Sequence, residues 1–231
     1  IGDPRWLPHP VRLMGHLIEI LRLKIEAIAG DNPLALKAGG VIITFILVFI
    51  SGLSGWLLER LALPMSPLPQ PIGEIVLVIA MASTIAAHSL RKSVLAVLDA
   101  LPKSIESDRL QIAREALSHI VGRDVWQLNR TEILRATAET ASENSVDGIF
   151  APLFWMLVGV GLWQCSQTLP GPLTLALIFK ASSTIDSMIG YKHGRMKWLG
   201  TAGAKLDDIL TWLPSRAVML TLPLISKPIR N

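Results

Sequence analysis

A run of 21 residues without a charged side chain, Ala38 to Leu58, constrains this chain more than any other feature of its sequence. Lys37 and Glu59 bound the run. An α-helix needs about 20 mostly apolar residues to cross the hydrocarbon core of a bilayer. The composition agrees, because 51% of the residues are hydrophobic and only 17% are charged, against about 25% charged in average soluble domains. We therefore expect an all-α fold, a polytopic integral membrane helix bundle.

Further apolar segments follow the first one. The 32 residues from Gly148 to Phe179 carry no charge, and a Pro-Gly-Pro sequence at 170–172 divides them. The last apolar stretch contains Pro214, Arg216 and Pro223, so it either spans the membrane or forms a re-entrant piece. We treat 1–231 as a single membrane domain, and its candidate spans are approximately 38–58, 72–90, 149–168, 172–190 and 209–225.

The positive charges between these segments alternate in number. Residues 1–37 contain five Lys or Arg, 59–71 contain one, 91–147 contain eight, 169–172 contain none and 191–208 contain four. Cytoplasmic loops of membrane proteins carry an excess of Lys and Arg. The three basic segments are therefore predicted to face the cytoplasm.

The polar insert of about 91–147 is predicted to be helical. It holds eight basic and nine acidic residues, and apolar positions recur at helical spacing between Ser107 and Val121. Asn129 is a plausible N-cap for a second helix. Residues 11–29 are predicted to form an amphipathic helix, which either lies along the cytoplasmic interface or packs on the bundle.

Three carboxylates, Glu139, Glu143 and Asp147, follow one another at a spacing of four residues. A helix places all three on one face, where like charges repel each other. One interpretation is a solvated face on which Arg135 pairs with Glu139. The other is a site for a metal or a substrate, because Mg²⁺ prefers oxygen ligands and commonly bridges to phosphates.

Charged residues also occur inside the later apolar segments. Lys180 and Asp186 lie within the candidate span 172–190, and ionisable residues at such positions are functional candidates by default. An ion pair is the alternative. Asp207 and Asp208 precede an apolar helix, where they are metal-ligand or base candidates or only favourable N-terminal charges. Arg216 requires a partner, and a carboxylate or a phosphate would serve.

Several classes of function are disfavoured by what the sequence lacks. A single cysteine, Cys165, rules out an internal disulfide framework, and the five histidines show no metal-binding spacing. No P-loop and no GxGxxG sequence is present. The net charge of +4 is too small to predict a nucleic-acid partner.

Five blocks of sequence together resemble the CbiB/CobD family, the adenosylcobinamide-phosphate synthases of cobalamin biosynthesis. They occur in the family's order and cover most of the chain. They are Gly2-Asp3-Pro4-Arg5-Trp6-Leu7-Pro8-His9-Pro10-Val11-Arg12, Val121-Gly122-Arg123-Asp124, the segment from Glu139 to Phe154, Asp186-Ser187-Met188-Ile189-Gly190-Tyr191-Lys192, and Leu206-Asp207-Asp208 with Pro214-Ser215-Arg216.

The resemblance implies a multi-pass enzyme of the bacterial inner membrane whose site faces the cytoplasm. It implies ATP- and Mg²⁺-dependent amide formation between the propionate of adenosylcobyric acid, a corrinoid, and (R)-1-amino-2-propanol or its O-phosphate. Membrane lipid and other membrane-bound cobalamin-biosynthesis enzymes are further expected partners. Family members usually have a membrane helix before the Gly2 block and continue beyond residue 231, so we expect a fragment or a shortened relative.

The chemistry that the resemblance implies gives the charged residues candidate roles. We expect catalytic carboxylates at Glu143, Asp147, Asp186 and Asp207. The expected substrate- or phosphate-binding cations are Arg123, Lys180, Lys192 and Arg216, and the expected metal ligands are Glu139, Glu143, Asp147 and Asp208. These residues are expected to converge on one cytoplasmic site, because phosphoryl transfer needs both acidic and basic groups.

A non-catalytic membrane protein is the competing hypothesis, either a scaffold of a cobalamin-biosynthesis complex or a transporter. The number of candidate spans and the intramembrane Lys180 and Asp186 support it. A transporter is expected to show related halves, and we find none in this sequence. A scaffold would not need several carboxylates gathered near one membrane face.

Overall fold

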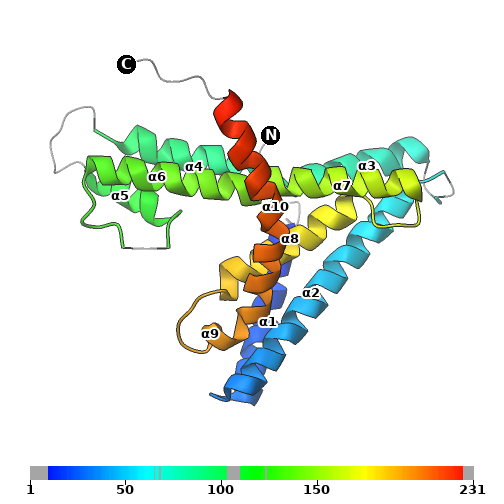
Figure 1. Cartoon of the computed structure of the whole chain (residues 1–231), viewed down its shortest axis with the longest axis horizontal. Helices are drawn as coiled ribbons and strands as arrows, with labels where there is room; N and C mark the ends of the chain where they lie inside the picture. The colour runs from blue at the N-terminus through cyan, green and yellow to red at the C-terminus, as the bar shows by residue number, and fades with distance from the viewer. Residues whose placement is uncertain (1–9, 65, 68, 103–109, 123, 226–231) are drawn as a thin grey trace. The chain divides into compact units, whose positions relative to one another are not determined.

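The computed structural model describes residues 10–64, 66, 67, 69–102, 110–122 and 124–225, the last four of these by their backbone alone. The described residues form helices and no strand, so the predicted all-α class is confirmed (Figure 1). The helices are α1 (Pro10–Ala29), α2 (Pro33–Leu61), α3 (Gln70–Ser83), α4 (Ala87–Ala100), α5 (Leu110–Ser118), α6 (Arg130–Ser145), the π-helical turn η2 (Val146–Phe150), α7 (Ala151–Cys165), α8 (Pro172–Ile189), α9 (Met196–Leu199) and α10 (Thr201–Ile225).

Three stretches are long and apolar enough to cross a membrane, judged by length and composition over the described residues. They are Pro33–Leu61, Gln70–Ala100 and Arg130–Cys165. This indicates a multi-pass membrane protein. The other two expected spans correspond to α8 and to the second part of α10, and their membrane crossing stays a prediction.

The ends of several helices follow from local side-chain chemistry. Asn32 caps α2, since its side-chain oxygen accepts hydrogen bonds from the Leu34 and Ala35 amides. The predicted N-cap Asn129 is confirmed, and it forms a complete capping box with Glu132. The predicted amphipathic helix 11–29 is also confirmed as α1, which buries Met14 and Ile18.

The segment expected to span from about 72 to 90 is helical in two parts, with a break at residues 84–86. At the end of α3, the Ser83 hydroxyl donates to the Ala80 carbonyl and the Thr84 hydroxyl to the Met81 carbonyl. The Ala86 amide, at the start of α4, donates to the Gly148 carbonyl at 2.8 Å instead of continuing a helix. Hydropathy alone did not reveal this interruption.

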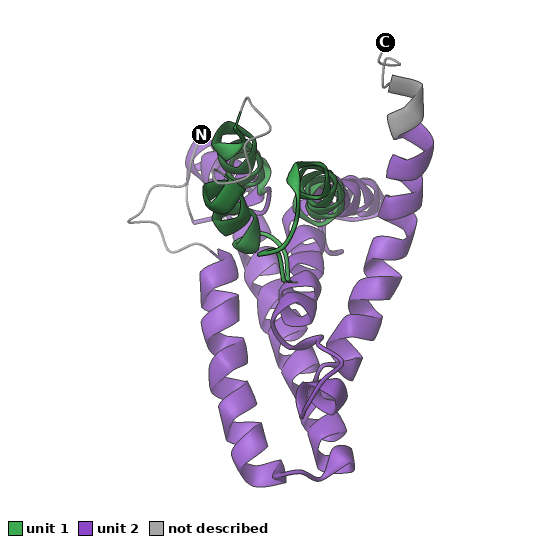
Figure 2. Ribbon diagram, turned by 90° about the vertical axis from the view of Figure 1, so that its left-hand side faces the viewer, with its two compact units in different colours: residues 1–2, 86–149 green, residues 3–85, 150–231 purple. Residues whose placement is uncertain are grey.

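The chain divides into two compact units, shown in green and purple in Figure 2. Among the described residues, unit 1 holds 86–149 and unit 2 holds those up to 85 and from 150 onward. Unit 1 therefore covers nearly the same residues as the polar insert of about 91–147 that the sequence indicates. Its core comes from α4, α5 and α6 and the segment between the last two, and consists of Val97, Leu110, Ala113, Leu117, Val125, Ile133 and Ala136.

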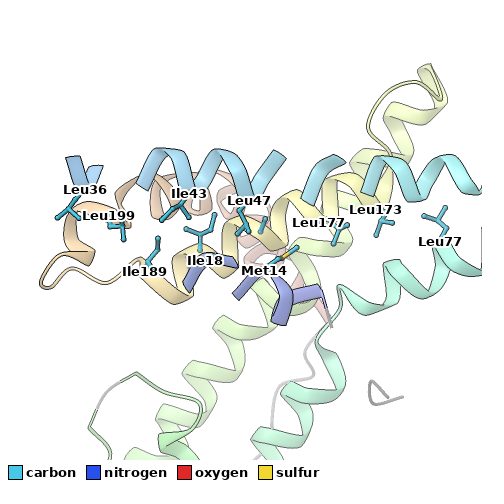
Figure 3. Close-up of a cluster of buried hydrophobic side chains, with 12 residues drawn as sticks. Met14, Ile18, Leu36, Ile43, Leu47, Leu77, Leu173, Leu177, Ile189 and Leu199 are labelled. Atoms are coloured by element: carbon cyan, nitrogen blue, oxygen red, sulfur yellow. The ribbon is translucent and has the colours of Figure 1, made fainter. Parts of the chain in front are cut away.

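The core of unit 2 surrounds α8, which is the helix with most buried residues among those described. Figure 3 shows how side chains of α1, α2, α3, α8 and α9 meet there. Two glycines of α2 allow very close approach of backbones. A Cβ atom at Gly40 would collide with the Leu199 carbonyl, and one at Gly55 would lie 2.7 Å from the Thr174 Cα. Helices in a membrane pack closely through such small residues.

A buried carboxylate fastens the start of α8 to the end of α2 within unit 2. Glu59 is only 1% exposed. Its oxygens accept hydrogen bonds from the Gly171 amide at 3.0 Å, the Thr174 amide at 2.8 Å and the Thr174 hydroxyl at 2.6 Å. These amides belong to the first turn of α8. The N-cap residue of this helix is a glycine, which has no side chain that could accept hydrogen bonds from them. The carboxylate also suits the positive end of the helix dipole.

Candidate functional site

The carboxylate stripe lies in unit 1, on α6 and on the turn that follows it. Arg135 donates to Glu139 at 2.9 Å, so the expected pairing of these two side chains is present. The Glu143 carboxylate is exposed and forms no hydrogen bond or ion pair with any described residue. The rise of 1.5 Å per residue separates Glu139 from Asp147 by about 12 Å along a helix axis. One ion therefore cannot bind all three carboxylates at once.

A π-helical turn changes the geometry at the end of the stripe. Residues Val146–Phe150 form η2, and Asp147 and the buried Gly148 lie inside it. A π-turn contains more residues than an α-turn, so Asp147 is displaced around the helix from the position that an α-helical spacing gives. Such turns occur frequently at functional sites. Asp147 is only partly exposed, in contrast to the exposed Glu143.

Two charged residues of α8 lie in unit 2. Lys180 and Asp186 are both partly buried. They are six residues apart on one helix, which places them about 240° apart around the axis and about 9 Å apart along it. This spacing differs from the three or four residues that separate neighbouring side chains on a helix surface. The Asp186 carboxylate lies against Gly190, where an added Cβ would collide with it.

The two adjacent aspartates of α10 have different surroundings. Asp207 is partly buried and its Oδ1 atom is inaccessible to solvent, whereas Asp208 is exposed. Neighbouring residues on a helix point about 100° apart, so the two carboxylates lie in different surroundings. Of the two, Asp207 lies on the packed side of α10, which contacts α8.

Arg216 has a different partner from the one that the sequence suggested. Its guanidinium lies 4.0 Å from the centre of the Trp212 ring, and it donates to the Trp212 carbonyl at 3.3 Å. A cation over an aromatic face is stabilised without a carboxylate or a phosphate. Four residues separate the two positions, which is the spacing of neighbours on a helix. Arg216 is exposed, so its outer side remains accessible.

The loop after α8 carries the last predicted cation of unit 2. Lys192 is exposed there. Nearby, the Arg195 guanidinium donates to the Asp31 carboxylate at 2.7 Å and joins this loop to the turn between α1 and α2. That hydrogen bond, together with the negative charge of Asp31, raises the pKa of Arg195. Arg123, the remaining predicted cation, lies outside the described residues.

No group of three His, Cys, Asp or Glu side chains gathers closely enough to hold a metal ion within the part of the chain that the structure describes. The expected ligands Glu139, Glu143 and Asp147 belong to unit 1, and Asp208 belongs to unit 2. Mg²⁺ needs only one or two carboxylates where substrate phosphates and water supply the other ligands. Glu143 is suited to that role because it is exposed and not engaged by a described residue.

A family model described as CobD/Cbib protein matches residues 1–230. This chain belongs to the CobD/Cbib family. No solved structure matches this family member.

The curated relatives of this family member carry consistent names. Cobalamin biosynthesis protein CobD of Synechocystis sp. is 37% identical over 226 residues, which cover 98% of this chain and 62% of the relative. The protein of the same name from Yersinia enterocolitica is 38% identical over 94% of this chain and 62% of its own length. Cobalamin biosynthesis protein CbiB of Salmonella typhi is 36% identical over 96% of this chain and 63% of its own length. The chain thus spans about three-fifths of the length of these relatives.

Sequence reasoning missed two hydroxyls of this CobD/Cbib protein. Helical Ser and Thr side chains here commonly donate to the carbonyl four residues earlier, as Thr184 does to Lys180 at 2.7 Å. Ser182 and Thr211 do not, although their hydroxyl oxygens are buried, and neither has a hydrogen-bond partner among the described residues. A buried hydroxyl without a partner is costly, so these two groups on α8 and α10 are candidates for positions that a ligand or water satisfies.

Proposed function

We propose that this chain acts in cobalamin biosynthesis as a membrane-bound enzyme that forms an amide at the expense of ATP. The acid is the propionate side chain of adenosylcobyric acid, and the amine is (R)-1-amino-2-propanol or its O-phosphate. The product is adenosylcobinamide or its phosphate. The observation that carries this proposal is family membership over residues 1–230, with curated relatives at 36–38% identity that are named cobalamin biosynthesis proteins.

The proposed chemistry explains why charged groups of both signs occur beside apolar segments. A carboxylate does not condense with an amine unaided, so one of its oxygens must first attack a phosphorus atom of ATP, which forms an acyl phosphate or a similar activated group and releases the remaining nucleotide. The amine nitrogen then forms the new C–N bond, the phosphate leaves with the C–O electron pair, and the amine proton passes to a base. ATP would supply the phosphoryl group, and Mg²⁺ would offset the negative charge of that group.

The residues of the chain have distinct proposed roles. Glu143 is the exposed carboxylate available to a Mg²⁺–nucleotide, with Asp147 one turn further along. Asp207 and Asp186 are the partly buried carboxylates suited to accept the amine proton. Lys180, Lys192 and the outer side of Arg216 are the cations suited to phosphate. Convergence of the unit 1 and unit 2 groups on one site stays a prediction.

We also propose that the protein is located in the bacterial inner membrane, with this site on the cytoplasmic side. A corrinoid and ATP are found in the cytoplasm. A site that receives both substrates therefore opens to the cytoplasmic side of the bacterial inner membrane. The basic segments 1–37, 91–147 and 191–208 support this orientation. A scaffold or transporter has no comparable use for Glu143 and its neighbouring carboxylates.

Complementation tests the proposal. The chain, and a version extended at both ends to the length of its relatives, are expressed in a bacterial strain that cannot make cobinamide. The extended version is expected to restore growth that depends on cobalamin, and its Glu143→Gln variant is expected to fail while inserting normally. Glu132→Gln is the matched control, because Glu132 caps α6 in the same unit and has no proposed catalytic role. Normal growth with Glu143→Gln would contradict the proposed role of the carboxylate stripe.

Restored cobinamide synthesis must also depend on the proposed substrates. Membranes that contain the extended protein are expected to convert adenosylcobyric acid only when ATP, Mg²⁺ and the amine or its phosphate are all supplied. Formation of the amide without ATP would contradict the proposed activation step. Growth that depends only on the presence of the protein, with no turnover in membranes, would favour a scaffold.

A further inference from the structure

Three basic side chains lie on one face of α4 in unit 1. His88, Arg91 and Lys92 occupy positions three and four residues apart, which places them together on a helix surface. All three are exposed. Over the residues that the structure describes, none of the three side chains forms a hydrogen bond or an ion pair.

This face of α4 lines a cavity of about 550 Å³. The described lining residues are His88, Arg91, Lys92, Leu95, Ala96 and Asp99. Val97, on the opposite side of the helix, is fully buried in the core of unit 1. The cations are therefore turned away from the core that holds unit 1 together, and packing of α4 does not require them.

The single described carboxylate of the cavity does not neutralise these cations. Asp99 is seven residues beyond Lys92, which corresponds to about 10 Å along the helix axis. The positive charges of the adjacent Arg91 and Lys92 repel each other. An anion bound between them would remove that repulsion. The cavity thus combines two permanent positive charges and a histidine, with no compensating group beside them among the described residues.

We propose that this face of α4 is a binding site for phosphate groups. An arginine offers a planar pair of N–H donors that matches two phosphate oxygens, and a lysine offers a compact point charge. A phosphate carries enough negative charge and enough acceptor oxygens to use both side chains and the histidine together. A single carboxylate would satisfy fewer of these donors.

Two sources of phosphate fit the position of the site. α4 follows the apolar helix α3, and the charge pattern predicts that it begins at the cytoplasmic face, where anionic phospholipid headgroups attract basic residues. The exposed Leu95 beside the cations suits a lipid. The alternative source is a soluble phosphate such as ATP, in which case the inference rests on the proposed function.

The experiment uses the whole chain and places a fluorescent reporter beside the three basic side chains of α4. Cys165→Ser removes the native thiol, and Ala96→Cys introduces one in the cavity for an environment-sensitive fluorophore; both positions are exposed. The labelled protein is placed in nanodiscs of phosphatidylcholine and titrated with inorganic phosphate and with ATP. A second series adds increasing fractions of phosphatidylglycerol to the discs without soluble phosphate.

A saturable fluorescence change in either series supports the site, and the series that shows it identifies the source. Arg91→Ala and Lys92→Ala are each expected to weaken the response about five-fold, as is typical for one cation near an anionic surface. Arg130→Ala is the matched control, because Arg130 is an exposed cation of unit 1 that does not line the cavity. It is expected to change the response less than two-fold.

Two results would overturn the proposal. One is the absence of a saturable change with both phosphate sources. The other is an equal loss of response in Arg130→Ala, which would mean that overall charge rather than this face governs binding. Complementation separates this inference from the proposed function. A fluorescence response without complementation would support the phosphate site and contradict the synthase activity. Complementation without a fluorescence response would support the synthase activity and contradict the phosphate site.

Discussion

Replacing Glu59 by alanine tests the contact that fastens α8 to α2. The change removes an acceptor of three hydrogen bonds and leaves two amides and one hydroxyl buried without partners. Hydrogen bonds to a charged group contribute about 1.5 to 3 kcal/mol each. Such losses are not additive, and three buried donors left unsatisfied at about 1 to 3 kcal/mol each give a combined loss of about 3 to 5 kcal/mol. We expect a loss of that size.

A loss of this size is measurable as a change in melting temperature. For a chain of 150–250 residues, 1 kcal/mol corresponds to about 2 to 4 °C, so Glu59→Ala should lower the midpoint by about 6 to 20 °C in detergent or nanodiscs. Glu59→Gln should lose less, about 1 to 2 kcal/mol, since its amide oxygen can still accept from one donor.

Glu74→Ala is the matched control for this measurement. Glu74 is also a glutamate in an apolar helix, but it is exposed and, among the described residues, accepts only from the Gln70 amide group of the same helix at 3.1 Å. Its loss should shift the midpoint by less than about 2 °C. An equally small shift for Glu59→Ala would refute the reasoning, because it would mean that water or mobile backbone satisfies the first turn of α8.

Three further predictions follow from single structural features. Ser182→Ala should leave the melting temperature unchanged or raise it, because the Ser182 hydroxyl has no described partner. Thr184→Val should instead lower stability by about 1 kcal/mol through loss of a hydrogen bond. A marked loss of stability in Ser182→Ala would show that the Ser182 hydroxyl is already satisfied. Asn129→Ala should cost about 1 kcal/mol by removing the capping box of α6, measured as the same thermal shift, and no change would mean that unit 1 does not use this cap. A cysteine within 91–147, in a Cys165→Ser background, should be labelled only by reagents that reach the cytoplasm; labelling from the periplasmic side would contradict the predicted topology.

Local patterns were enough to predict several helices of this chain. Periodic apolar residues gave α1, and Asn129 gave the start of α6, because both depend on residues within a few positions of each other. The 21-residue uncharged run lies within α2, although that helix extends beyond it at both ends. Family membership was also predictable, since it rests on blocks of sequence rather than on packing.

Contacts between distant parts of the chain were not predictable in the same way. Glu59 looked like the charged end of a span, and only its burial against Gly171 and Thr174 reveals its role. The break at 84–86 depends on a hydrogen bond to Gly148, which hydropathy cannot show. The partner of Arg216 was within reach of sequence reasoning, because Trp212 lies four residues before it. The roles of the candidate site residues stay predictions.

The close approach of α2 and α8 has a consequence for the order in which the chain is made. Glu59 and Thr174 are 115 residues apart, and ribosomes add about 5 to 20 residues per second. The face of α2 that carries Gly55 must therefore wait about 6 to 23 s for its partner α8 to be synthesised. During this interval, the whole of unit 1 emerges and can fold around its own core. Until α8 arrives, lipid or an insertion factor has to cover the narrow glycine surface of α2.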